Sequence, residues 1–157
     1  MANEIETKLA ELGIELPGPS AAAGNYVPAV EAGGMLYISG QIARNADGSP
    51  MVGRLGDAMD VAAGQAAARS CAIQIIAAAN NALGGLSRIE RIVKLQGFVS
   101  ATADFTDQPA VINGASDLMV EVFGSEMGSH ARAAVGMGSL PLGVPVEIDA
   151  VIALKPA

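Results

Sequence analysis

The sequence is poor in residues on which several protein classes depend. Among its 157 residues are one cysteine, one histidine and no tryptophan. Cys71 cannot close an internal disulfide, and with a single histidine it does not make an ordinary His/Cys metal site, so we expect no metal. Residues 1–8 lack the basic and apolar regions of a secretion signal, which favours a cytoplasmic protein.

The chain is also short of charge, and the charge that it carries is mostly acidic. Charged residues make up 16% of the sequence and hydrophobic residues 51%, a balance that excludes a disordered chain and indicates one globular domain. Nine basic residues and a net charge of −7 do not supply a phosphate-binding surface, so nucleic acid is not expected as a partner. Residues 73–83, the most apolar stretch, are too few to span a membrane.

Hydrophobic periodicity predicts paired strands around two helices. Gly33 and Gly34 supply the positive φ of a tight hairpin, and apolar positions recur at helical spacing from Asp57 or Asp60 to Leu83. A short helix over residues 5–12 and a connector rich in proline and glycine over 16–24 come first. The other predicted elements are strands 26–30 and 35–42, the long helix, a strand 89–100, a helix over 105–124, and strands 132–137 and 144–154.

This order, ββαβαββ, predicts an α+β fold. We expect a single domain with one mainly antiparallel or mixed sheet and both helices on one face. The other face carries few charges, and another copy of the chain would be its most economical cover. We divide the chain into an N-terminal extension, residues 1–24, and a domain, residues 25–157.

Arg132 stands out because it begins an otherwise small and apolar strand. A buried guanidinium needs a partner, and its planar fork suits a carboxylate. Two interpretations stay open: Arg132 binds an anionic small molecule, or it forms an internal salt bridge with Glu147 or Asp149.

Glu147 and Asp149 are two positions apart in a predicted strand and therefore share one face. A partly desolvated carboxyl group beside a like charge has a raised pKa, which suits proton transfer near neutral pH. The alternative is that both side chains face solvent at a sheet edge.

Other polar residues also allow two interpretations. Tyr26 and the Ser39-Gly40 pair lie at strand ends beside glycines, where they could serve a ligand or be an ordinary aromatic and an edge bulge. His130, in a loop of glycine and serine, is expected to be solvated or structural rather than catalytic. Cys71, inside the long helix, is expected to be a buried inert thiol.

Three separated regions together resemble one known family. They are GNYVPAV from Gly24, LYISGQI from Leu36, and ARAAV from Ala131 followed by LPLGVPVEIDA from Leu140. In this order and at this spacing they are similar to the RidA/YjgF family, whose older name is endoribonuclease L-PSP. The resemblance covers residues 25–154 and implies a chorismate-mutase-like fold and a homotrimer with three ligand pockets between subunits.

The resemblance also implies an activity, the hydrolysis of reactive enamines and imines such as 2-aminoacrylate to 2-keto acids and ammonia, without a cofactor. Carried over by position, Arg132 would hold the carboxylate of a small imino or keto acid, and Glu147 would orient or activate water. The pocket would be shaped by Tyr26, Ser39, Gly40, Asn113 and Ala134.

The sequence departs from the family at three places. Ala134 stands where members commonly have a cysteine, the segment 113–132 is slightly longer, and residues 1–24 precede the usual start. These departures indicate a divergent subgroup. The alternative function is non-enzymatic binding of small carboxylates or keto acids, whereas the acidic charge and few aromatics disfavour a ribonuclease.

Overall fold

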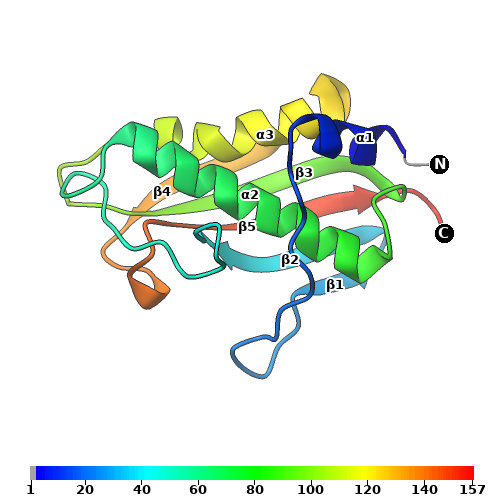
Figure 1. The fold of residues 1–157 in the computed structure, drawn as a ribbon, viewed down its shortest axis with the longest axis horizontal. Coiled ribbons are helices and arrows are strands. Elements are labelled where there is room, and N and C mark those ends of the chain that lie inside the picture. The colour runs from blue at the N-terminus through cyan, green and yellow to red at the C-terminus, as the bar shows by residue number, and fades with distance from the viewer. Residues whose placement is uncertain (1–2) are drawn as a thin grey trace.

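The computed structural model describes residues 3–157 and confirms the predicted order of strands and helices (Figure 1). Helix α2 begins where the side chain of Asp60 accepts a hydrogen bond from the Ala63 backbone, and it ends at Gly84 in the left-handed conformation. The elements are α1 (Glu4–Glu11), β1 (Ala29–Ala32), β2 (Met35–Ile42), α2 (Val61–Leu83), β3 (Ile89–Ser100), α3 (Gln108–Gly128), β4 (Ala131–Met137), a 3-10 turn (Pro141–Gly143) and β5 (Val146–Leu154).

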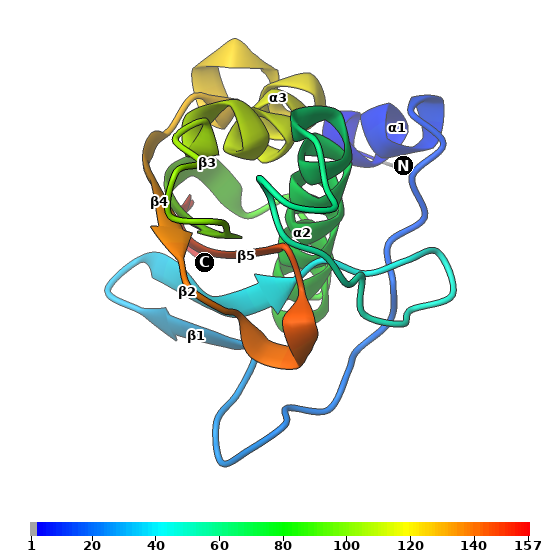
Figure 2. The ribbon, with the colours of Figure 1, turned by 90° about the vertical axis from the view of Figure 1, so that its left-hand side faces the viewer.

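The strands form one mixed sheet in the order β1-β2-β5-β3-β4. β3 and β4 are parallel because α3 crosses over between them, and the other neighbours are antiparallel. Figure 2 shows α2 and α3 together on one side of this sheet, as predicted. The described part of the chain therefore has the expected two-layer α+β fold.

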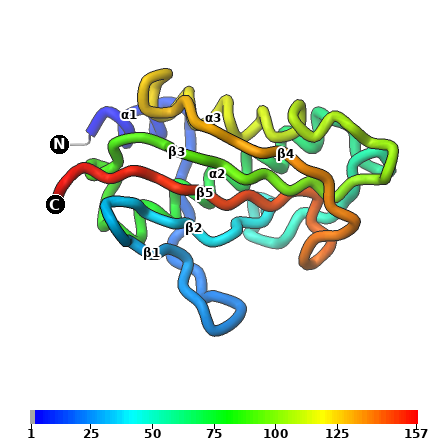
Figure 3. The backbone as a smooth tube through the Cα atoms, turned by 180° about the vertical axis from the view of Figure 1, so that it is seen from behind, coloured from blue at the N-terminus to red at the C-terminus, as the bar shows by residue number. Residues whose placement is uncertain are grey.

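The opposite face of the sheet has no helical layer over it in residues 3–157, as Figure 3 shows from behind. Strand β5 alternates regularly, with Val146, Ile148 and Ala150 buried toward the helices and Glu147 and Asp149 on the other face. We call the uncovered side the open face. It exposes large apolar side chains, among them Val30, Tyr37 and Val135.

Helix α2 is the central helix of the covered face. By length and composition it could cross a membrane, but nine of its residues are buried against the sheet and its neighbours, so it is a core helix. A Cβ at Gly114 of α3 would collide with the Gln65 backbone of α2, which shows how closely the two helices pack. Cys71 is completely buried, and burial raises the pKa of its thiol, so the predicted inert cysteine is confirmed.

Several element boundaries differ from the prediction. β1 begins at Ala29 rather than residue 26, and β5 at Val146 rather than residue 144, because each strand follows a proline that has no N–H to donate. Helix α3 begins at Gln108 and does not stop at Gly124. This glycine adopts φ 78° and ψ 166°, which kinks the chain before one further turn.

Residues 13–28, which we call the strap, connect α1 to β1. Leu9 of α1 is buried in the same core as the sheet, so the strap starts from a fixed point on the helical layer. From there the chain crosses α2 and loops out beyond β1 before it enters the sheet (Figure 1). The strap therefore lies beside both faces of the β1–β2 edge.

Candidate functional site

Four of the predicted site residues line one pocket, which we call the Glu147 pocket. Tyr26, Ser39, Gly40 and Glu147 surround a cavity of about 340 Å³ beside the strap. A bulge in β2 between Ile38 and Gln41 brings Ser39 and Gly40 to this position opposite β5. These four residues therefore come together within a single chain.

Gly40 allows Glu147 to lie against the bulge. A Cβ at this position would collide with the Glu147 carboxyl group, so a larger residue would displace the acid. Ser39 is held from the other side, because its Oγ donates a hydrogen bond of 2.7 Å to the Val27 carbonyl of the strap. The bulge and the strap together fix the walls around the carboxyl group.

Glu147 and Asp149 share the open face of β5, which is the central strand of the sheet and not an edge. Partial burial raises the pKa of Glu147, and the negative charge of Asp149 raises it further. Burial also raises the pKa of Asp149, although Lys94 opposes this effect. The Gln96 amide nitrogen is placed to donate to both Asp149 oxygens, at 3.0 and 3.2 Å. Glu147 is therefore the acid of the pair that is available for proton transfer.

Arg132 lies elsewhere, at the edge strand β4 next to α3. Its Nη1 donates to Ser116 Oγ at 3.0 Å and its Nη2 donates to the Pro109 carbonyl at 3.2 Å. The ion pairs found within residues 3–157 do not include it, so an internal salt bridge with Glu147 or Asp149 is not formed. Three of its five N–H donors stay available to another partner.

Asn113 and Ala134 belong to the same region as Arg132. Asn113 is exposed on α3 at the helical spacing that puts it between Pro109 and Ser116, the two residues that Arg132 contacts. Ala134 follows Arg132 by two positions in β4 and packs against the core. We call Arg132, Asn113, Ala134 and Ser116 the Arg132 edge.

The Glu147 pocket and the Arg132 edge do not meet within one chain. Glu147 of β5 lies opposite Phe98 of β3. Arg132 of β4, the strand on the other side of β3, lies opposite Leu95, three residues before Phe98. Strand geometry puts them roughly 10 Å apart across the sheet and roughly 10 Å along it. Leu95 is buried under the helices, so Arg132 projects to the helical side and Glu147 to the open face.

His130 is part of a chain of hydrogen bonds that ends at Arg132. Its Nδ1 lies 2.6 Å from the Gly128 carbonyl and its Nε2 lies 2.9 Å from Ser116 Oγ. A carbonyl can only accept, so Nδ1 carries the proton and Nε2 accepts from the Ser116 hydroxyl. The lone pair of Ser116 then faces Arg132, which agrees with the structural role predicted for His130.

Sequence reasoning missed Ser116, and it also missed several residues that line the Glu147 pocket, among them Arg44 and Leu142. Arg44 follows β2 by two residues, on the Glu147 side by strand alternation, and lines the pocket while its Nη1 donates to the Gly48 carbonyl at 2.8 Å. Leu142 lines the rim with a positive φ of 58°, which is uncommon for this residue. The sequence signal for Arg44 was its spacing of two residues from Ile42, which puts both side chains on the same side of the strand.

Comparison with known proteins decides the family. The model of the YjgF/chorismate mutase-like endoribonuclease family matches residues 6–148. The chain belongs to the YjgF/RidA family. The predicted family and its fold are thus confirmed.

Its relatives in the YjgF/RidA family differ in what their names say. Protein TCP17 of Trypanosoma cruzi is 48% identical over 98% of this chain and 96% of its own length. A 2-iminobutanoate/2-iminopropanoate deaminase of Dermatophagoides farinae is 30% identical over 90% of this chain and 95% of its own length. The crystal structure of Atu1372 from Agrobacterium tumefaciens, a protein of unknown function, has a TM-score of 0.89 at 46% identity and covers 98% of this chain and 95% of that one.

No group of three or more His, Cys, Asp or Glu side chains that could hold a metal ion occurs among residues 3–157. The functional groups that the two regions of the YjgF/RidA chain offer are hydroxyls, carboxylates and guanidinium groups. In the Glu147 pocket these are an acid with a raised pKa, two hydroxyls and the Arg44 guanidinium, and at the Arg132 edge they are a cation with free donors.

Proposed function

We propose that this protein hydrolyses reactive enamines and imines of the 2-aminoacrylate and 2-iminopropanoate type to 2-keto acids and ammonia. The observation that carries the proposal is Glu147, a half-buried acid with a raised pKa in a pocket that Tyr26 and Ser39 also line. The relative named as an imine deaminase supports the same substrate class.

The reaction needs positioned water and a series of proton transfers, which one carboxyl group can relay. Proton addition at the terminal carbon of the enamine, with loss of a proton from its nitrogen, gives the imine. Glu147 then accepts a proton from water as the water oxygen bonds to the C=N carbon, and it returns that proton to the nitrogen, which gives a carbinolamine. Transfer of the carbinolamine hydroxyl proton to the nitrogen accompanies cleavage of the C–N bond, which releases ammonia and leaves the keto acid. A raised pKa makes both directions of transfer accessible near neutral pH.

Arg132 is the proposed anchor for the substrate carboxylate. Ser116 and Pro109 hold its guanidinium, and its remaining donors suit a carboxylate bidentately. Because Arg132 and Glu147 project from opposite sides of one sheet, the proposal includes a homotrimer in which the Arg132 edge of one copy lies against the Glu147 pocket of the next. The uncovered apolar side chains of the open face, including Tyr37 and Val135, support such an assembly.

Non-enzymatic binding of a small carboxylate or keto acid is the second candidate. It is favoured by the separation of Arg132 from Glu147, because a binding protein needs only the cation. Ala134, at the position of the common family cysteine, also changes the wall beside Arg132.

The test is release of 2-keto acid from 2-aminoacrylate generated in situ by enzymatic dehydration of serine. Wild type should accelerate release, and Arg132→Ala and Glu147→Gln should each lose at least about 100-fold in kcat/KM. Arg69→Ala, which removes a half-exposed arginine of α2 paired only with Glu121 among the described residues, is the matched control and should behave as wild type.

Three outcomes separate the candidates. Acceleration that survives in Arg132→Ala would refute the anchor. Binding of pyruvate without acceleration would support the non-enzymatic candidate. Cleavage of a single-stranded RNA that Glu147→Gln abolishes would instead support the endoribonuclease activity in the family description.

A further inference from the structure

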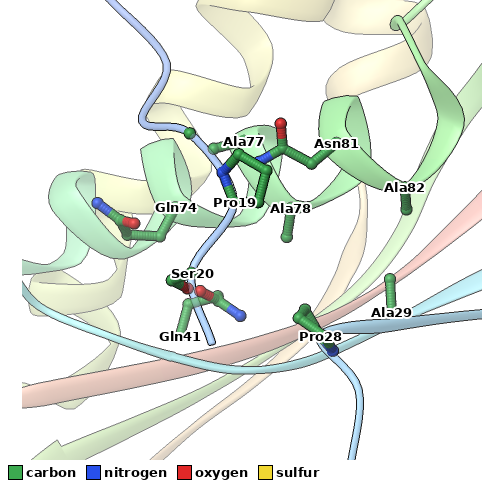
Figure 4. Close-up of a pocket in the computed structure, with 11 residues that line it drawn as sticks. Pro19, Ser20, Pro28, Ala29, Gln41, Gln74, Ala77, Ala78, Asn81 and Ala82 are labelled. Atoms are coloured by element: carbon green, nitrogen blue, oxygen red, sulfur yellow. The ribbon is translucent and has the colours of Figure 1, made fainter. Parts of the chain in front are cut away.

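A second cavity lies on the helical side of the sheet, between the strap and α2 (Figure 4). Its volume is about 270 Å³, and strap residues that include Pro19 and Ser20 form its outer wall. Gln41 of β2 lines it from the sheet, because this side chain pairs with the helix-facing Ile148 and not with Glu147. The cavity adjoins the Glu147 pocket, because Ser20, Pro28 and Gln41 line both, but its inner wall is α2 and Glu147 does not line it.

The walls of this cavity are polar but carry no charge. Every residue that lines it lies within the described part of the chain, and none is Lys, Arg, Asp, Glu or His. Its polar groups are the amides of Gln41, Gln74 and Asn81 and the hydroxyl of Ser20. A charged ligand would lose its hydration here without gaining a counter-charge, so the walls favour a neutral one.

The amides have hydrogen-bonding capacity that the described chain does not use. Gln74 has no side-chain hydrogen bond to any residue among 3–157, and the only one at Asn81 is a long contact of 3.5 Å to the Pro17 carbonyl. Gln41 Nε2 donates to the Ser39 carbonyl at 3.0 Å, which leaves its oxygen to accept. Each side-chain amide has an N–H donor beside a carbonyl acceptor. A ligand group that has an acceptor beside a donor can therefore form two hydrogen bonds with it.

The size of the cavity suits a small ring. Alanines of α2, Ala77, Ala78 and Ala82, line one side, and their short side chains leave the hollow open. An apolar cavity of about 150 Å³ holds benzene, so about 270 Å³ accommodates a ring with a polar substituent. Larger side chains at these positions would fill the space.

We propose that this cavity binds a small, neutral, planar molecule that carries a carboxamide or lactam edge. Gln74 and Gln41 recognise the edge, the alanines of α2 contact the ring, and the strap closes over it. The proposal does not rest on the imine chemistry proposed for Glu147, although the two cavities share the wall formed by Ser20, Pro28 and Gln41.

The experiment is a titration of the full chain with benzamide, 2-pyridone and benzoate, followed through the side-chain amide resonances of Gln41 and Gln74 by NMR. Benzamide tests a carboxamide, 2-pyridone tests a lactam, and benzoate has the shape of benzamide with a charge. At least one neutral probe should shift both amides, and benzoate should bind at least about tenfold more weakly.

Variants locate the binding. Ala78→Leu should abolish it by filling the cavity, and Gln74→Leu should weaken it about tenfold through the lost hydrogen bonds. Ala66→Leu, at an exposed position of the same helix, should bind as wild type does. Thermal unfolding verifies that each variant is folded, and Gln74→Leu keeps the test decisive should Ala78→Leu be unstable. Benzoate binding as tight as that of benzamide, binding retained in folded Gln74→Leu, or no shift by either neutral probe at millimolar concentration would overturn the proposal.

Discussion

The Glu147 pocket and the Arg132 edge place opposite charges on opposite sides of one sheet. The pocket is built from the strap, a bulge in β2 and the central strand β5, whereas the edge is built from α3 and β4. Had Glu147 and Arg132 shared a face, they would have been free to pair. Arg44 also lines the pocket, but its Nη1 donates to the Gly48 carbonyl and it forms no ion pair with Glu147 among the described residues. Their separation leaves Glu147 with a raised pKa and Arg132 with free donors, so each keeps a property that a substrate can use.

The strongest test of whether the two regions act together is to place the Arg132 and Glu147 substitutions in different copies of the chain. Arg132→Ala and Glu147→Gln should each be nearly inactive alone, because each removes one side of the proposed joint site. If the two proteins are mixed, unfolded and refolded together, about a quarter of the interfaces in a cyclic trimer pair an intact Arg132 with an intact Glu147. Keto acid release should then recover to about a quarter of the wild-type rate.

Two controls make the recovery specific. The same variants mixed without unfolding should stay inactive for as long as subunits do not exchange, and each variant refolded alone should stay inactive. If the refolded mixture shows no recovery although both proteins reassemble, the site is not shared between copies.

Gly40 offers a smaller perturbation on the acidic side alone. In Gly40→Ala the new methyl group would push the Glu147 carboxyl group aside, and since that group ends a flexible side chain, the fold should be retained. We expect kcat to fall at least about tenfold with little change in thermal stability, because the acid is misplaced relative to water. Gly138→Ala is the matched control, since this glycine has open space around its Cβ position and no positive φ. Equal losses of activity in both variants would show that Glu147 placement is not the cause.

The sequence predicted the elements more completely than it predicted how they meet. Alternation and helical spacing identified β3 and α2, and the Gly33-Gly34 turn identified the first hairpin, because these signals are local. The helix past Gly124 was missed because a glycine with positive φ is a common stop signal that here only kinks the chain. Whether a glycine ends a helix or only kinks it depends on tertiary contacts.

The same limit applies to the candidate site. The Ser39-Gly40 pair and the shared face of Glu147 and Asp149 follow from spacing within one segment, and both were predicted. That Arg132 turns toward α3 depends on its pairing with Leu95 in a parallel strand, which no local pattern shows. The contacts of Ser116 with His130 and Arg132 depend on the same crossover.

Ser116 allows the cationic side to be tuned without removing the charge. Ser116→Ala deletes the acceptor that holds Arg132 Nη1, so the guanidinium should lose its orientation while it stays present. We expect KM to rise about tenfold with kcat nearly unchanged, because a hydrogen bond to a charged group is lost. Ser116→Thr restores the hydroxyl and should recover most of the affinity, and Ser125→Ala, at an exposed position of the same helix, is the control. A fall in kcat with KM unchanged would contradict an orienting role.

The smallest expected effect concerns stability and distinguishes the acidic side from any ordinary surface acid. Because burial raises the pKa of Glu147 in the folded state, the folded protein holds this proton more tightly than the unfolded chain, whose glutamate pKa is about 4.3. The protonated acid is thus fully favourable below that value, and stability is lost as pH rises through the raised pKa. Glu147→Gln cannot ionise and escapes this loss, so its melting temperature should exceed that of wild type at neutral pH by a margin that shrinks toward about pH 4. Glu90→Gln, at an exposed position of β3, should show a margin that varies less with pH. A constant margin for Glu147→Gln across this range would mean that the acid is not strained by its burial, and the pocket would then lack the property on which its proposed chemistry depends.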